Sequence, residues 1–155
     1  MAKYLVLALL LGAATPASAQ MALLPDGDYA VQLGDVVVRA DVSQNQTTIS
    51  GPDVTTWSVP ATPRLFGLSP SGDQMLAIHE GRHIDAVEPF LLVATVYRRD
   101  GDGFTFRHIA LSTLRLPQIL PRDDLGLRWL DAFSTVADGW ILSLSDGKTA
   151  KIPFN

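Results

Sequence analysis

The feature that most constrains this chain is the alternation of short apolar runs with turn-forming Gly, Asp and Pro. Residues 29–33 and 36–42 each alternate apolar with other side chains, and Gly34-Asp35 separates them. Strict alternation gives an extended strand one apolar face, and Gly beside Asp supplies the turn of a hairpin. The same arrangement returns around Asp146-Gly147 near the end of the chain. These patterns predict antiparallel strand pairs.

The segment Phe90–Arg99 is the most apolar part of the chain after its N-terminal stretch. Its β-branched and aromatic residues predict a strand buried on both faces. The residues 100–103, with the sequence Asp-Gly-Asp-Gly, then predict a turn into a partner strand. On that strand Phe104, Phe106 and His108 share one face with Ala110.

One helix is predicted near residues 124–135. Asp123 or Asp124 can cap its start, and Leu125, Trp129, Leu130 and Phe133 follow at helical spacing. The resulting fold class is mainly β: a single antiparallel β-sandwich or small barrel-like domain with this one short helix. Core packing is the predicted role of Trp57, Trp129 and Trp140.

The first nineteen residues have the order of a secretory signal peptide. Lys3 precedes an uncharged apolar stretch over residues 4–14, and Ala17-Ser18-Ala19 forms a cleavage site before Gln20. The stretch is shorter than the roughly 20 residues that span a bilayer. We therefore expect a signal peptide at 1–19, a single β-rich domain at 20–155 without a transmembrane helix, and a periplasmic or secreted product.

Charge and cysteine content exclude two further classes. The chain carries a net charge of −4, its basic residues are scattered, and it has no cysteine. Nucleic-acid binding requires a basic stripe that this sequence lacks. Disulfides, which support many small exported domains, are impossible here, so the core must provide the stability.

The sharpest chemical motif is His79-Glu80-Gly81-Arg82-His83, an H-E-x-x-H pattern. It resembles the motif of the zinc metallopeptidases over these five residues. The resemblance implies zinc as the cofactor, His79 and His83 as metal ligands one helical turn apart, and Glu80 as the catalytic base. His108, the third histidine of the chain, is the candidate for completing the ligand set.

The residues around the motif favour a strand and a turn over the helix that it requires. Apolar residues from 75 to 87 would lie all round a helix, and Gly81 would cost about 1 kcal/mol in its interior.

The leading functional hypothesis is therefore a non-enzymatic binding or accessory module of the cell envelope. It has no assigned catalytic, cofactor or metal residue, and the expected kind of partner is another envelope protein. A small zinc metallopeptidase using the HEGRH segment is one alternative, and a small outer-membrane β-barrel is the other.

Overall fold

The computed structural model describes residues 23–79, 81–116 and 119–154, and the predicted signal peptide lies outside them. These residues form four antiparallel sheets. The first contains β1 (Tyr29–Leu33), β2 (Val36–Asp41), β3 (Gln46–Gly51) and β4 (Val54–Val59) in chain order. The second contains β5 (Leu65–Leu68), β6 (Gln74–Ile78), β8 (Leu92–Asp100) and β9 (Gly103–Ala110).

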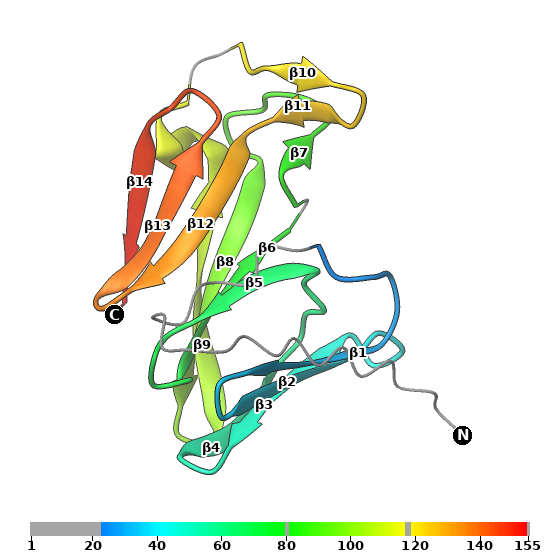
Figure 1. Ribbon diagram of the computed structural model, residues 1–155, viewed down its shortest axis with the longest axis vertical. Coiled ribbons are helices and arrows are strands. Elements are labelled where there is room, and N and C mark those ends of the chain that lie inside the picture. The colour runs from blue at the N-terminus through cyan, green and yellow to red at the C-terminus, as the bar shows by residue number, and fades with distance from the viewer. Residues whose placement is uncertain (1–22, 80, 117–118, 155) are drawn as a thin grey trace.

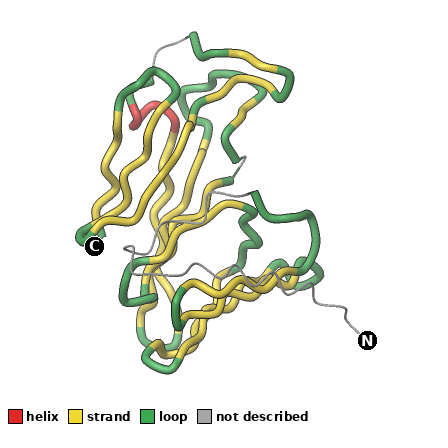
Figure 2. Tube along the Cα trace, viewed as in Figure 1, coloured by secondary structure: helices red, strands yellow, loops and turns green. Residues whose placement is uncertain are grey.

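The other two sheets are smaller. One contains β12 (Leu130–Val136), β13 (Gly139–Leu144) and β14 (Thr149–Pro153). The other has the order β10-β11-β7, from β10 (Arg122–Asp123), β11 (Gly126–Arg128) and β7 (His83–Ile84). A single 3₁₀ turn, η1 (Leu111–Leu114), is the helical element of the described residues and appears in red in Figure 2.

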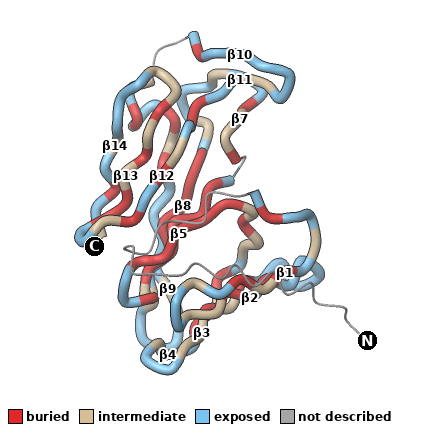
Figure 3. The backbone as a smooth tube through the Cα atoms, viewed as in Figure 1, coloured by how far each residue is buried: buried red, intermediate tan, exposed pale blue. Residues whose placement is uncertain are grey.

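The sheet β5-β6-β8-β9 lies between the other layers and contributes to two hydrophobic clusters (Figure 1). On β6, Leu76 and Ile78 pack with β12–β14, whereas Met75 and Ala77 pack with β1–β4. Every residue of β6 is therefore buried, and Figure 3 shows the red, buried segments running through this sheet. The buried strand predicted over residues 90–99 is confirmed as β8, because both of its faces are covered.

The predicted hairpins are confirmed. Gly34 links β1 to β2 with a φ of 59°, and Gly147 lies between β13 and β14 with a φ of 81°. These left-handed conformations are the ones that glycine adopts without a steric cost. The turn at residues 100–103 joins β8 to β9, where Asp100 pairs with Gly103.

The helix predicted near residues 124–135 is wrong, because this segment forms β11 and β12. The register of β12 against β13 shifts between Leu130 and Ala132, so one extra residue enters the strand. This bulge brings Leu130 and Phe133 to the same face, opposite Leu144 and Leu142. A spacing of two residues thus becomes three, which imitates the apolar spacing of a helix. The side chain of Asp123 accepts from the Leu125 N–H in a hairpin turn and caps no helix.

The mainly β, sandwich-like form of the predicted fold is confirmed. Each sheet is open, with an outer strand at either side, so the barrel-like alternative is not the arrangement of the described residues. Within residues 23–79, 81–116 and 119–154, no helix has the length and apolar character to cross a membrane.

Candidate functional site

Two of the three histidines meet at one buried threonine. Thr95 on β8 pairs in register with Ala77 on β6 and with His108 on β9. Its Oγ1 lies 2.7 Å from Nε2 of His79 and 2.9 Å from Nδ1 of His108. His79 directly follows β6, and its backbone N–H donates to the carbonyl of Val93. The three strands thus place both imidazoles on the same face of the sheet.

The shared hydroxyl couples the protonation of the two rings. Thr95 has one proton, so it can donate to one neutral imidazole only while it accepts from the N–H of the other. The tautomer of His79 therefore determines that of His108 when both rings are neutral. The exposed His108 ring also contacts the Phe106 ring at a centroid distance of 5.0 Å.

A cleft of about 290 Å³ opens beside His79. One wall is the strap, defined here as residues 60–63 between β4 and β5, and the floor is formed by β6 and β8. The lining residues combine apolar surface with a few polar groups: Asn45, the strap residues Pro60, Ala61, Thr62 and Pro63, then Ala77, Ile78, His79 and Tyr97. We call this the histidine cleft.

Side chains from the first sheet and its β2–β3 turn hold the strap in place. The carbonyl of Pro60 accepts from Asn45 Nδ2 at 3.3 Å, and that of Ala61 accepts from Thr47 Oγ1 at 2.6 Å. The hydroxyl of Tyr29 donates to the carbonyl of Pro63. Prolines cannot donate to a backbone ladder, so these side chains satisfy the strap where strand pairing does not. The wall of the cleft is therefore rigidly attached to the first sheet.

Replacing Tyr29 with phenylalanine is expected to loosen this wall. The change leaves the buried Pro63 carbonyl without its donor, which costs about 1–3 kcal/mol of unfolding free energy. Burial raises the pKa of the Tyr29 hydroxyl to about 12, against a smaller lowering by the hydroxyl of Thr47. Urea unfolding of wild type and Tyr29→Phe, measured over alkaline pH, checks both effects.

The expected pH dependence follows from the raised pKa. Tyr29 stays protonated in the folded chain while its unfolded counterpart ionises near pH 10, so wild-type stability falls between pH values of about 10 and about 12. The limiting slope is about 1.4 kcal/mol per pH unit, and Tyr29→Phe should lose this component. Tyr97→Phe is the matched control, since Tyr97 makes no contact with the Pro63 carbonyl and should leave the Tyr29 component in place. A Tyr29→Phe curve parallel to wild type would contradict the assignment.

The H-E-x-x-H segment does not form the helix that a zinc peptidase requires. Its first histidine follows β6, and its last begins β7. His83 Nε2 lies 2.8 Å from the carboxylate of Asp123 on β10, away from the shared hydroxyl of Thr95. This hydrogen bond, together with the Leu125 N–H, holds the pKa of Asp123 below its ordinary value. Glu80 lies outside the described residues.

The structure therefore brings His79 and His108 together and separates His83 from them. No group of three or more His, Cys, Asp or Glu residues in the described part of the chain has the arrangement of a metal site.

Sequence reasoning did not identify Thr95 or the strap as parts of a site. The alternation along β8 does put Thr95 on the same face as Tyr97, but the partner of that face depends on strand register. The three tryptophans confirm their predicted role in packing, since Trp57, Trp129 and Trp140 are all buried.

Comparisons with protein-family models, with curated proteins and with solved structures found no match to this chain.

Proposed function

We propose that this chain is an exported binding module of the cell envelope that acts without catalysing a reaction. In this proposal residues 1–19 are removed as a signal peptide, and residues 20–155 work in the periplasm as one domain. The charged start, the apolar stretch and the Ala17-Ser18-Ala19 site support export. The partner is a segment of another envelope protein.

The histidine cleft carries the binding part of the proposal. Its volume of about 290 Å³ is at the lower end of the range of ligand pockets, so it suits a few side chains of a protein partner better than a whole cofactor. Pro60, Ala61 and Ile78 offer apolar contact, while His79 and Asn45 offer hydrogen-bonding groups at the same place. The complementary segment therefore carries an apolar side chain next to a polar group.

The burial of Thr95 favours binding over catalysis. Its hydroxyl is the nucleophile type that both imidazoles contact, and this pairing is the arrangement of nucleophile and base in many enzymes. However, Thr95 is 0% exposed, so a substrate cannot reach the hydroxyl. The network instead holds His79 in a defined orientation beside the cleft.

A photo-reactive phenylalanine analogue placed at Thr62 is expected to form an adduct with an envelope protein in living cells. Thr62 lines the cleft, whereas the exposed Thr149 on β14 gives a matched control position in a different sheet. The adduct should come from the periplasmic fraction, and sequencing of this chain within it should begin at Gln20. His79→Ala should reduce the adduct about fivefold, which corresponds to the loss of one hydrogen bond of about 1 kcal/mol.

Two outcomes would refute the proposal. Equal labelling from positions 62 and 149 would remove the cleft as the binding site. A protein that stays in the cytoplasm with Met1 retained would remove export and, with it, the envelope role.

A further inference from the structure

The outer edge of β9 has none of the usual protection of a sheet edge. With eight residues it is the longest outer strand among the described sheets. Natural edges are commonly protected by lysine, proline or a bulge. The edge strand β14 carries Lys151 and Pro153, but β9 has neither residue type. Its one charged residue other than histidine, Arg107, donates to the carbonyl of Pro153 at 3.3 Å and is directed back to its own chain.

The register shows which backbone groups of β9 face outward. The N–H of Arg99 donates to Asp73, on the side of β6, so the backbone groups of Arg98 face β9 instead. Arg98 pairs with Thr105. The backbone groups of Thr105 consequently face β8.

Alternation along β9 then assigns the remaining positions. The N–H and C=O groups of Arg107 also face β8, whereas those of Phe104, Phe106 and His108 face away from the sheet. No backbone partner for these outward groups occurs within the described residues.

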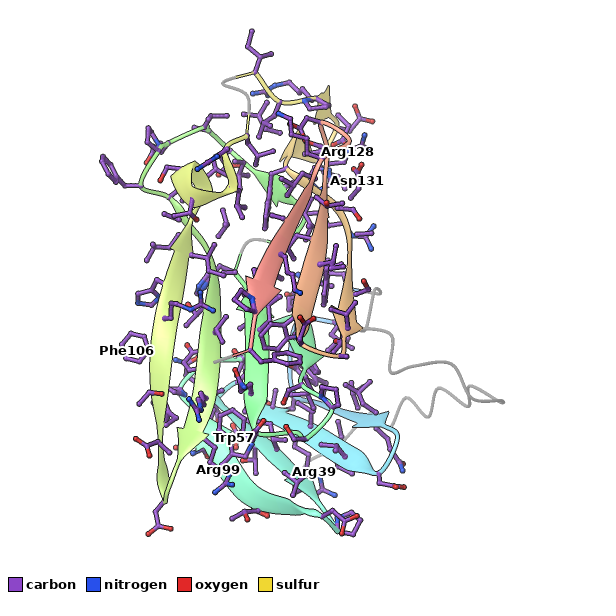
Figure 4. All side chains as sticks on the ribbon, turned by 90° about the vertical axis from the view of Figure 1, so that its left-hand side faces the viewer. Arg39, Trp57, Arg99, Phe106, Arg128 and Asp131 are labelled. Atoms are coloured by element: carbon purple, nitrogen blue, oxygen red, sulfur yellow. The ribbon has the colours of Figure 1, made fainter. Side chains whose placement is uncertain are left out.

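The same three residues form an aromatic stripe along the edge. The rings of Phe104 and Phe106 lie 6.5 Å apart, and that of His108 continues the row at 5.0 Å from Phe106. Phe106 is 58% exposed at the middle of the strand. Figure 4 shows it projecting from the margin of the molecule. Unpaired backbone groups and exposed apolar surface thus coincide.

We propose that β9 pairs antiparallel with β9 of a second copy of this chain, across a two-fold axis at Phe106. Centring on this residue pairs the outward groups of Phe104 with those of the partner's His108. It also places Thr105 opposite the partner's Arg107, so no like charges face each other. The strand is self-complementary in this register, as a two-fold interface requires.

The neighbouring registers are poorer. Centring on Arg107 would put two guanidinium groups directly opposite each other, which is destabilising. Centring on Thr105 would draw Asp100 and Asp102 of the tight β8–β9 turn into the pairing. With Phe106 at the axis, nearly all of β9 pairs, and the two sheets join into one continuous sheet with a double aromatic stripe. This pairing protects both edges.

Analytical ultracentrifugation of the exported, purified protein is expected to give the mass of two chains. Phe106→Pro removes an outward N–H that the β8–β9 ladder does not use, so the fold tolerates it while the dimer is lost. Phe106→Lys should also give a monomer, by placing two charges at the axis. Phe90→Lys is the matched control, because Phe90 is 87% exposed outside β9 and its replacement should leave the dimer intact.

Cysteine pairs test the register without relying on Phe106. The chain has no cysteine of its own, so introduced thiols report directly. A mixture of Thr105→Cys and Arg107→Cys proteins should form an intermolecular disulfide, because directly opposed residues with inward backbone groups have Cα atoms about 4.5 Å apart. Each variant alone should form little.

Several results would overturn the pairing. They are a wild-type monomer at the highest soluble concentration, a dimer that survives both Phe106 variants, and self-linking of either cysteine variant in preference to the mixture.

Discussion

Replacing Trp129 with alanine is expected to lower the unfolding free energy by about 3–5 kcal/mol. Trp129 is 0% exposed and lies in the cluster between the middle sheet and β12–β14. Its Nε1 donates to the carbonyl of Gly81 at 3.0 Å, and its backbone N–H donates to Arg82 at 3.0 Å. The alanine variant therefore loses the packing and leaves the Gly81 carbonyl unpaired. Chemical denaturation at neutral pH measures the change.

Two further variants separate packing from hydrogen bonding at this position. Trp129→Phe keeps most of the apolar contact and should cost about 1–3 kcal/mol, mainly for the unpaired carbonyl. Leu125→Ala is the surface control: Leu125 is largely exposed nearby, and its replacement should stay within about 0.5 kcal/mol of wild type. A Trp129→Ala protein as stable as the Leu125→Ala control would contradict the assignment of Trp129 to the core.

Replacing Trp140 with alanine is also expected to cost about 3–5 kcal/mol, and this cost should be coupled to Gly67. Trp140 is 0% exposed, and a Cβ on Gly67 would lie 2.9 Å from its Nε1 and 3.0 Å from the ring of Phe133. Gly67→Ala alone should therefore cost about 1–3 kcal/mol through overpacking. In the Trp140→Ala background, where the cavity provides room, the added cost should largely disappear.

A double-mutant cycle by denaturant unfolding measures this coupling. Trp140→Phe provides the control for ring packing. The indole Nε1 is buried without a hydrogen-bond partner among the described residues, so removing it should cost less than about 1.5 kcal/mol. Additive effects of Gly67→Ala and Trp140→Ala would show that the strand and the ring do not share this space.

The hairpins could be predicted because their determinants are local. Gly34-Asp35 and Asp146-Gly147 combine a turn sequence with alternating flanks, and both signals lie within a few residues of each other. The burial of β8 on both faces was also predictable, since an apolar run without a polar face indicates two covering layers. The two covering sheets themselves could not be assigned from such runs, because either face of β6 or β8 can meet any apolar surface.

The error at residues 124–135 shows where local patterns fail. The spacing between Leu130 and Phe133 is the same in a helix and in a strand with one bulged residue. Pairing with β13 decides between them, and β13 is not part of the segment. The candidate site has the same limitation: a motif drew attention to His79 and His83 as a pair, but the register of three strands joins His79 to His108 instead.

The amino-acid sequence by itself determined the strands, the turns and the apolar faces of this protein, because alternation and turn chemistry act over a few neighbouring residues. Only the tertiary structure decided the long-range pairings: Thr95 between His79 and His108, and the strap held by Tyr29. The unpaired edge at Phe106 belongs with them, because it exists only once β8 and β9 have paired. Such contacts depend on which strands meet and in what register, and that choice follows from the free energy of the whole packed core.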